Sequence, residues 1–277
     1  LFAAGCSEPA PGPWRLEKVT ELGGFTIPES FAVDHANNCV YVSNCGGEKD
    51  KSWEDDATGF ISKISPDGKM IEREWIRSEP GAVLNDPKAL EIFDGMLYIS
   101  DNKRLLRVPL DRSGPAEVVD LGSTDNLGDI MASGDFLYIG YGSKKQILRL
   151  DTRGNVEVLK GLEAINGMVA HRGKMFAVTW TGHEVYELDV AGSGGAVSFG
   201  LSDNFKNLDG IVALEDGTFI ISDFMGNKLY TIAPDRKTLE GVATVASPAD
   251  IVLDRDAGLL YVPSYLHGKI TVYWVTR

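Results

Sequence analysis

Six segments of the sequence share one pattern, and this repeat constrains the fold more than any other feature. Each segment is a short apolar strand, a turn and a second strand. The spacings between successive repeats are 58, 41, 38, 43 and 40 residues, measured from the residue placed before the first strand. Those residues are Glu29, Pro87, Gly128, Asn166, Asp209 and Ala249. A period of about 40 residues with four strands per unit is typical of a β-propeller.

Two further strands follow in each unit, except that the sixth unit lacks a fourth strand because the sequence ends there. Residues 14–22 form an unassigned strand of suitable length at the other end of the chain. We therefore predict an all-β fold, a six-bladed β-propeller with four antiparallel strands per blade. The N-terminal strand would complete the last blade and close the ring, which removes exposed strand edges. Residues 14–277 would form this single domain, with a polar insertion at 45–59.

Residues 1–13 resemble the end of a bacterial lipoprotein signal peptide. An apolar stretch leads to Ala4-Gly5-Cys6, a small-small-Cys lipobox, although Ala3 stands where Leu is usual. A lipidated Cys6 with a flexible tether to Pro13 would anchor the domain on the outer side of a bacterial membrane, facing the periplasm or the exterior. The alternative is an ordinary apolar N-terminus with a chance cysteine.

The charge of the chain narrows the range of partners. The net charge is −13, from 27 basic and 40 acidic residues. Such a surface repels the phosphates of nucleic acids and the anionic head groups of lipids. No run of about 20 apolar residues could form a transmembrane helix. The expected partners are a small-molecule substrate or a protein, and contact with a membrane would be through the lipid anchor alone.

The remaining cysteines and the histidines indicate no catalytic group. Cys39 and Cys45 lie at opposite ends of one predicted strand, which spans about 20 Å, whereas a disulfide needs about 6 Å between Cα atoms. We expect both thiols to be free and partly buried. The four histidines lie in predicted turns and loops, and no GxSxG, HExxH, phosphate-loop or Rossmann motif occurs.

Residues placed before the first strand of each blade should meet around the central channel. This would bring together the oxygen-bearing side chains of Glu29, Asn166 and Asp209, with Asp129 and Asp250 one residue further along their own blades. Carboxylates around a narrow axis repel each other unless a cation lies between them. Glu, Asn and Asp oxygens suit a hard cation. The alternative is that these side chains accept hydrogen bonds from backbone amides at the strand entries.

At these positions the chain resembles the gluconolactonase, senescence marker protein and luciferin-regenerating enzyme family. The resemblance covers all six blades and is most specific at Pro28-Glu29-Ser30, Asn166-Gly167-Met168 and Leu208-Asp209-Gly210-Ile211. It implies one divalent cation, with Ca²⁺ expected first and Mg²⁺ or Zn²⁺ as alternatives, held by Glu29, Asn166 and Asp209. It also implies that Asp209 serves as a catalytic base or positions the nucleophile.

The second blade departs from this family pattern. Asn85 resembles the family's substrate-binding Asn. However, alignment on the turn at Asp94-Gly95 places Pro87, not Asn85, at the position equivalent to Glu29, Asn166 and Asp209. Lys88 would then point into the channel and either bind an anionic ligand or replace the cation in a cluster of ion pairs. We take Asn85, Lys88, Asp129 and Asp250 as candidate substrate-binding residues.

Two functions follow from these observations. The first is a metal-dependent hydrolase of lactones or related esters, exported and lipid-anchored. The alternative is a non-catalytic propeller that serves as a binding or assembly subunit of a cell-envelope complex, since the fold alone does not determine function. Strictosidine synthase-like chemistry is a third candidate, but the catalytic Glu on which that family depends has no counterpart here.

Overall fold

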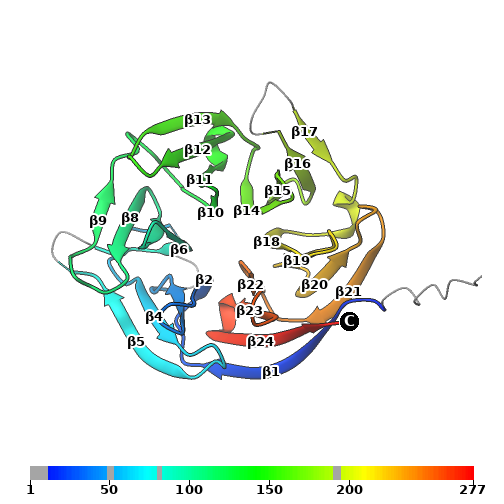
Figure 1. Ribbon diagram of the computed structural model, residues 1–277, viewed down its shortest axis with the longest axis horizontal. Coiled ribbons are helices and arrows are strands. Elements are labelled where there is room, and N and C mark those ends of the chain that lie inside the picture. Colours follow the sequence, from blue (N-terminus) through cyan, green and yellow to red (C-terminus); the bar gives the residue numbers. More distant parts are fainter. Residues whose placement is uncertain (1–11, 49–52, 80–82, 190–194) are drawn as a thin grey trace, which may run out of the picture.

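The computed structural model describes residues 12–48, 53–79, 83–189 and 195–277, which form six small β-sheets arranged in a ring (Figure 1). Each sheet has four strands, and adjacent strands are antiparallel throughout. The innermost strand of each sheet faces the centre of the ring. The predicted six-bladed propeller is confirmed.

The blades follow one another along the chain. Blade one contains β2 (Pro28–Asp34), β3 (Cys39–Asn44), β4 (Phe60–Ile64) and β5 (Met70–Arg77). Blade two contains β6 (Pro87–Phe93), β7 (Met96–Asp101), β8 (Arg104–Pro109) and β9 (Glu117–Val119). Blade three contains β10 (Ile130–Ser133), β11 (Phe136–Tyr141), β12 (Gln146–Asp151) and β13 (Val156–Lys160).

The second half of the ring repeats this order. Blade four contains β14 (Ile165–His171), β15 (Lys174–Thr179), β16 (Val185–Leu188) and β17 (Ala196–Ser198). Blade five contains β18 (Leu208–Ala213), β19 (Phe219–Asp223), β20 (Lys228–Ile232) and β21 (Leu239–Thr244). Blade six contains β22 (Val252–Asp254), β23 (Leu259–Ser264), β24 (Lys269–Thr276) and the N-terminal β1 (Arg15–Gly23).

Strand β1 completes blade six, as the sequence predicts. It lies along β24 with pairings from Arg15 with Thr276 to Gly23 with Lys269 (Figure 1). Beyond the strand, the indole of Trp14 donates a hydrogen bond to Asp216 of blade five at 3.0 Å. The two ends of the propeller are therefore joined within a single sheet.

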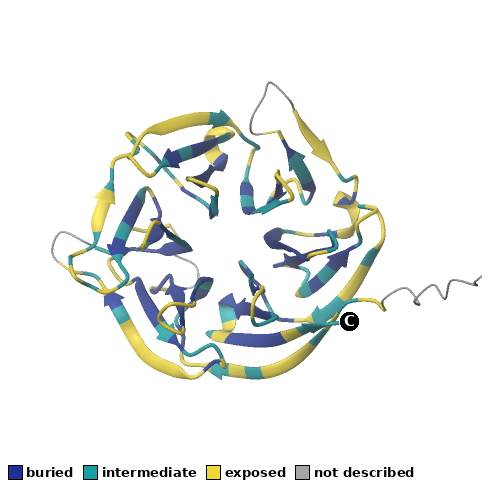
Figure 2. Ribbon diagram, in the orientation of Figure 1, coloured by how far each residue is buried: buried dark blue, intermediate teal, exposed yellow. Residues whose placement is uncertain are grey.

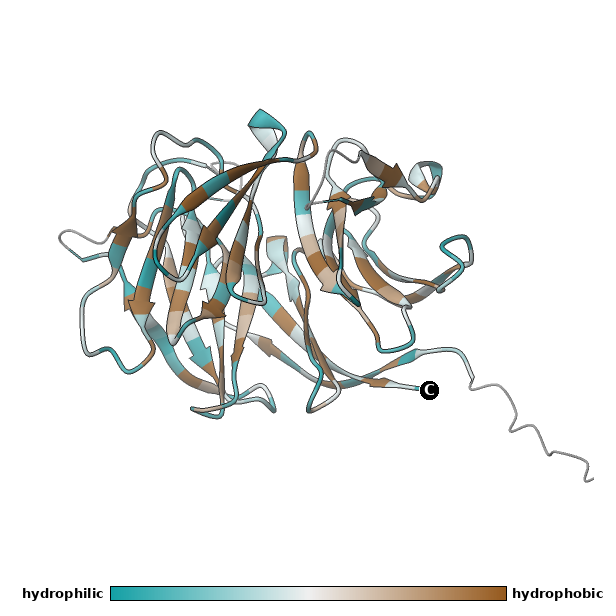
Figure 3. Cartoon of the chain, turned by 45° about the horizontal axis from the view of Figure 1, so that its top comes forward, coloured by the Kyte–Doolittle hydropathy of each residue, from teal (hydrophilic) through white to brown (hydrophobic). Residues whose placement is uncertain are grey.

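The hydrophobic core lies between neighbouring blades. Tyr41 and Ile61 of blade one pack in one cluster with Leu97 and Ile99 of blade two, and similar clusters occur around the ring. Burying such a side chain contributes about 1.5–3 kcal/mol. Figure 2 shows the inner and middle strands largely buried and much of the outer strands exposed, and Figure 3 shows hydrophobic residues along the strands. The apolar side chains of the strands thus pack between neighbouring blades.

Cys39 and Cys45 are both free and buried, in agreement with the prediction. The helices in the described ranges are three short 3₁₀ turns, η1 (Gly142–Lys144), η2 (Ser202–Asn204) and η3 (Tyr265–His267). In these ranges no helix has the length and apolar character needed to cross a membrane. Cys6 and the lipobox lie outside the described residues, so lipid anchoring stays a prediction.

Candidate functional site

Strand pairing places one residue from each of four inner strands at the same level of the channel. Pro28, Pro87, Ile165 and Leu208 each pair with the last residue of the following strand, and each pairing is followed by a register shift. The next residues along the chain are therefore equivalent, and these are Glu29, Lys88, Asn166 and Asp209.

This register corrects the alignment of blade two. The sequence alignment placed Pro87 beside Glu29, whereas the structure places Lys88 there. The cause is the turn used for the alignment: Asp34 and Cys39 pair across four residues in blade one, but Phe93 and Met96 pair across two in blade two. A lysine thus occupies the column that carries oxygen-bearing side chains in blades one, four and five.

The equivalent residues line one cavity of about 670 Å³ in the channel. This volume is within the range of small-molecule sites. Of the predicted site residues, the cavity brings together six: Glu29, Lys88, Asp129, Asn166, Asp209 and Asp250.

Two glycines allow the inner strands of blades four, five and six to approach each other closely. A Cβ atom at Gly167 would lie 2.5 Å from the Asp209 carbonyl oxygen, and one at Gly210 would lie 2.4 Å from the Ile251 nitrogen. These glycines follow Asn166 and Asp209 directly. Side chains larger than hydrogen would push the strands apart, so the glycines keep Asn166 and Asp209 close to the neighbouring inner strands.

The carboxylates of Asp129 and Asp250 are occupied by structural hydrogen bonds. Asp129 accepts bonds from the backbone nitrogens of Ile130 at 2.7 Å and Met168 at 2.6 Å. Asp250 accepts a bond from the Ser30 hydroxyl at 2.6 Å. These two acids join adjacent blades, which is the structural role that the sequence left open for acidic residues at this level.

Glu29, Asn166 and Asp209 have no comparable partners. Among the described residues, none donates a hydrogen bond to the side chains of Asn166 or Asp209, and the only donor near Glu29 is the Cys45 thiol at 4.0 Å. The His, Cys, Asp and Glu side chains of the described ranges form no group of three that could hold a metal. A cation bound here would therefore need the amide oxygen of Asn166 as its third protein ligand.

Burial makes these acids weak. Burial raises the pKa of Glu29 to about 7, with a partly offsetting effect of the Lys88 charge and a further upward effect of Asp86 and Asp250. Burial also raises the pKa of Asp209 well above its usual range, and the negative charges of Glu29, Asp250 and Asp129 act in the same direction. A cation at this level of the channel would relieve that repulsion.

The Lys88 side chain places a positive charge at this level of the channel, and it forms an ion pair with Asp86. Its ammonium nitrogen lies 3.0 Å from an Asp86 oxygen, and both side chains are more than nine-tenths buried. It also lies 3.6 Å from the Cys45 sulfur and 4.8 Å from the centre of a Trp53 ring. Burial lowers the pKa of Lys88, but the surrounding acidic groups outweigh this effect and the net shift is well upward. The side chain therefore stays charged.

Asn85 lies outside the lining of this cavity. Its amide oxygen accepts a hydrogen bond from the Ala57 backbone at 3.1 Å, and its amide nitrogen donates to Asp55 at 3.3 Å. Asp86 likewise accepts a bond from the Trp53 backbone. The Asn85-Asp86 pair thus holds the end of the insertion against blade two, and Lys88, the second residue of β6, lines the cavity instead.

The sequence analysis missed an aromatic side of the cavity. Trp180, Phe224 and Tyr265 line it, together with Trp53 from the insertion. The first three directly follow the second strands of blades four, five and six. The repeat alignment contains this signal, because the three aromatic residues occupy equivalent positions directly after the second strand. The sequence-based site prediction considered only the positions before the first strand.

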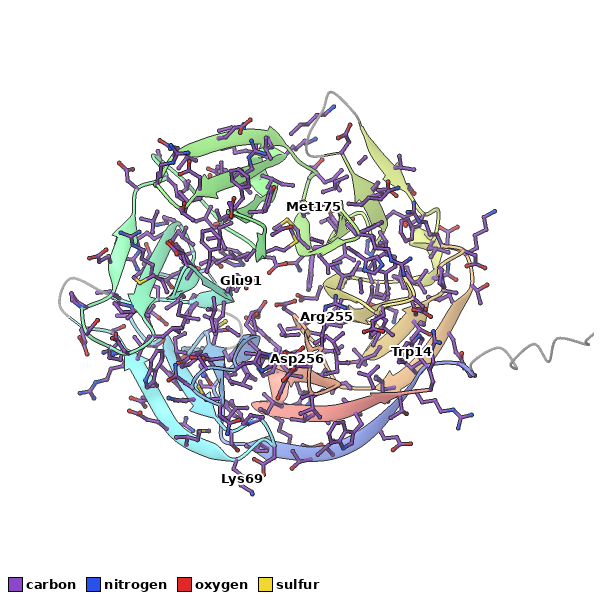
Figure 4. The ribbon with its side chains drawn as sticks, viewed as in Figure 1. Trp14, Lys69, Glu91, Met175, Arg255 and Asp256 are labelled. Atoms are coloured by element: carbon purple, nitrogen blue, oxygen red, sulfur yellow. The ribbon has the colours of Figure 1, made fainter. Side chains whose placement is uncertain are left out.

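A second cavity of about 420 Å³ lies further along the same inner strands. It shares Asp129 and Asp250 with the first cavity, and its own lining includes His35 and Glu91. The His35 ring lies 3.5 Å from an Asp254 oxygen. Glu91, Arg255 and Asp256 lie around the open centre of the ring (Figure 4). The channel therefore has polar residues at both ends, with Asp129 and Asp250 between them.

No protein-family model and no curated protein sequence matches this chain. Solved structures do match it over nearly their full length. A virginiamycin B lyase from Staphylococcus aureus is 15% identical, with a TM-score of 0.63 over 95% of this chain and 100% of that one. A gluconolactonase-family protein is 15% identical, with a TM-score of 0.69 over 96% and 93%. A luciferin-regenerating enzyme is 16% identical, with a TM-score of 0.67 over 96% of each chain.

These neighbours are propeller enzymes, and two of them belong to the family that the sequence resembles. Identity of 15–16% establishes the shared fold and leaves the chemistry of the site to its own residues. The chain therefore shares the six-bladed propeller fold of these proteins.

Proposed function

We propose that this propeller is a divalent-metal-dependent hydrolase of lactones or related esters. One observation carries the proposal. Glu29, Asn166 and Asp209 line the same cavity without structural hydrogen-bond partners among the described residues, whereas Asp129 and Asp250 each accept a hydrogen bond from the adjacent blade. The oxygens of these three side chains are thus open to the cavity and available to a ligand, since Glu29 and Asn166 are only half-buried.

The chemistry of these oxygens favours a hard cation. Two carboxylates and one amide oxygen suit Ca²⁺ or Mg²⁺ better than a metal that prefers thiolate or imidazole. The single nearby thiol, Cys45, is a poor ligand, because burial raises its pKa well above the usual range. Glu29, Asn166 and Asp209 would hold the ion, which supplies Lewis-acid polarisation of the ester carbonyl when bound.

The side chains of the cavity can perform the proton transfers of ester hydrolysis. Asp209 would accept a proton from the attacking water and return it to the alkoxide oxygen of the leaving group, so that ester and water become acid and alcohol. Burial raises the pKa of this carboxyl, which makes it a stronger base than an exposed aspartate. The Lys88 ammonium would stabilise the negative charge that develops on the carbonyl oxygen.

A non-catalytic binding role is the second candidate, and Lys88 is the observation that favours it. Lys88 occupies the position in blade two that is equivalent to Glu29, Asn166 and Asp209, the proposed metal ligands. Its ammonium group partly offsets the negative charge of the acids around it. In that case the cavity would bind a ligand without metal or hydrolysis.

Metal binding and hydrolysis can be tested on the same protein. The chain is stripped with a chelator, Ca²⁺, Mg²⁺ and Zn²⁺ are added separately, and the thermal unfolding midpoint is measured. Hydrolysis of glucono-δ-lactone and δ-valerolactone is measured in parallel. We expect millimolar Ca²⁺ to raise the midpoint, because an ion that binds only the folded state stabilises it.

The variant D209N removes the proposed base and one ligand. It should abolish the Ca²⁺ shift and reduce hydrolysis by about 10²–10⁴-fold, the usual contribution of a general base. The control D120N changes an exposed turn residue that binds the Gly122 backbone, and it should behave as the unmodified chain does. A chain that binds none of the three ions at millimolar concentration would overturn the metal-dependent hydrolase and favour the binding role.

A further inference from the structure

Three of the aromatic residues that line the cavity, Trp180, Phe224 and Tyr265, form one continuous wall. Trp180 follows β15, Phe224 follows β19 and Tyr265 follows β23, so each stands at the same point of its blade. The ring centres of Trp180 and Phe224 are 5.3 Å apart, and those of Phe224 and Tyr265 are 5.5 Å apart. These are the tilted and edge-on contacts that aromatic side chains prefer.

This wall covers only the side of the cavity formed by blades four to six. The same point carries Cys45, Asn102 and Gly142 in blades one, two and three. On the blade-three side the lining residues are Asn126 and Ser143, with small glycines beside them. The cavity is therefore apolar on one side and offers hydrogen-bonding groups on the other.

Backbone hydrogen bonds fix the aromatic wall in place. The nitrogen of Trp180 donates to the Ala164 carbonyl at 2.9 Å, and that of Phe224 donates to the Asn207 carbonyl at 2.8 Å. The nitrogen of Tyr265 donates to the Ser247 carbonyl at 3.0 Å. Because the residues are already ordered, a ligand that packs against them loses little free energy to ordering the protein.

The positive charge below the wall disfavours a cationic ligand. The Lys88 ammonium lines the same cavity and would repel an organic cation. Lys88 itself already lies over the Trp53 ring at 4.8 Å and near the Tyr265 ring at 5.9 Å, where a cationic ligand would be attracted. A neutral ligand avoids this conflict.

We infer that the preferred substrate is a neutral lactone fused to, or carrying, an aromatic ring. The ring would pack against Trp180 and Phe224, and the ester would point toward Asp209 and Lys88. This inference rests on the proposed hydrolase function for the reaction, but its ring-binding part is independent of hydrolysis. A cavity of about 670 Å³ accommodates a bicyclic molecule.

The test compares matched ligands with and without the aromatic ring. Dihydrocoumarin and δ-valerolactone are the substrates, and 2-tetralone and cyclohexanone are their non-hydrolysable carbocyclic analogues. Binding of the two ketones is measured by calorimetry, and kcat/KM is measured for both lactones and for glucono-δ-lactone. We expect 2-tetralone to bind about tenfold or more tightly than cyclohexanone, since one well-packed aromatic contact accounts for such a factor. In kcat/KM, dihydrocoumarin should exceed δ-valerolactone by more than the ratio of their uncatalysed hydrolysis rates, because its phenolate is the better leaving group.

Variants test whether the aromatic wall causes the preference for ligands that contain an aromatic ring. W180A should remove most of the preference for 2-tetralone while the binding of cyclohexanone changes less than about twofold. F224L keeps an apolar side chain and serves as a second variant if W180A folds poorly. The control W274A removes a tryptophan that is 45% exposed on β24, outside the cavity, and should leave the preference intact.

The outcomes separate this inference from the proposed function. If δ-valerolactone or gluconolactone is hydrolysed as well as dihydrocoumarin, and 2-tetralone binds no better than cyclohexanone, the ring preference is wrong and the hydrolase stands. If no lactone is hydrolysed with any ion but 2-tetralone binds in a Trp180-dependent way, the hydrolase is wrong and the ring site stands. Equal weakening of both ketones by W180A would also overturn the inference.

Discussion

Lys88 is a charged residue in a place where charge is costly, and its pair with Asp86 makes this placement tolerable. Both side chains are more than nine-tenths buried, and the two charged atoms are 3.0 Å apart. A buried pair of this kind adds little net stability relative to an apolar pair, but losing one partner leaves an uncompensated charge.

We therefore expect K88M to lower the free energy of unfolding by about 3–5 kcal/mol, because Asp86 is left buried and unpaired. The double variant K88M/D86N should recover most of that loss. Urea unfolding at neutral pH measures both. As a control, K103M removes a partner of Asp55 in a pair whose side chains are 55% and 48% exposed, which should cost less than about 1 kcal/mol. A K88M effect as small as that of K103M would contradict this account.

At the scale of single residues, the sequence predicted which side chains line the site better than it predicted their contacts. Glu29, Asn166 and Asp209 were singled out because they share a column of the repeat, and the structure does place them around one cavity. Lys88 was misaligned by one residue because turn length differs between blades. The bond between Asn85 and the insertion depends on the path of a loop, which no local pattern specifies.

The strands themselves were predicted well, because alternating apolar residues and glycine-containing turns are local signals. The outer strands were overestimated where little packs against them. The pattern of residues 116–121 predicts an outer strand of six residues, but β9 is only Glu117–Val119. The sequence predicted that β1 closes the ring because the sixth repeat lacked a fourth strand and the strand at residues 14–22 belonged to no repeat.

Strand β1 should be essential for the ring. Removing residues 1–23 would expose the edge of β24, whose backbone groups pair with β1 from Lys269 to Thr276. We expect a lower thermal midpoint and self-association, because an unpaired edge accepts strands from other molecules. Thermal unfolding and size-exclusion chromatography measure these effects. Removing only residues 1–12 leaves β1 and Trp14 in place and should change neither. A chain without residues 1–23 that stays monomeric with an unchanged midpoint would show that β1 does not close the ring.

For the molecule as a whole, the main electrostatic feature is that buried acids from most blades meet in one channel. Burial raises the pKa of Glu29 and of Glu91 to about 7 and that of Asp250 to about 6. It also raises the pKa of Asp129 and of Asp209 well above their usual range. Blades one, two, three, five and six each contribute one of these groups. The ring brings together acids that are far apart in the sequence, so only the tertiary structure determines their strength.

These shifts fix the sign of the pH dependence. An acid whose pKa is higher in the folded state holds its proton more tightly there, so its stabilising effect is complete below its ordinary pKa of about 4. That effect is lost as the pH rises through the folded value. For the metal-free chain we therefore expect the free energy of unfolding to fall between about pH 4.5 and 8.

Glu91 allows this expectation to be tested away from the proposed metal ligands, because it lines the second cavity. Its shift arises first from burial and is increased by the charge of Asp250, while backbone amides of Ala132 and Ile92 partly offset it. In E91Q the side chain cannot ionise, so the difference in unfolding free energy between pH 5 and pH 8 should shrink. Urea unfolding in the presence of a chelator measures it. E72Q, on the exposed face of β5, should keep the difference of the unmodified chain. An E91Q chain with that same full difference would mean that the Glu91 carboxyl is already ionised at pH 5 in the folded ring.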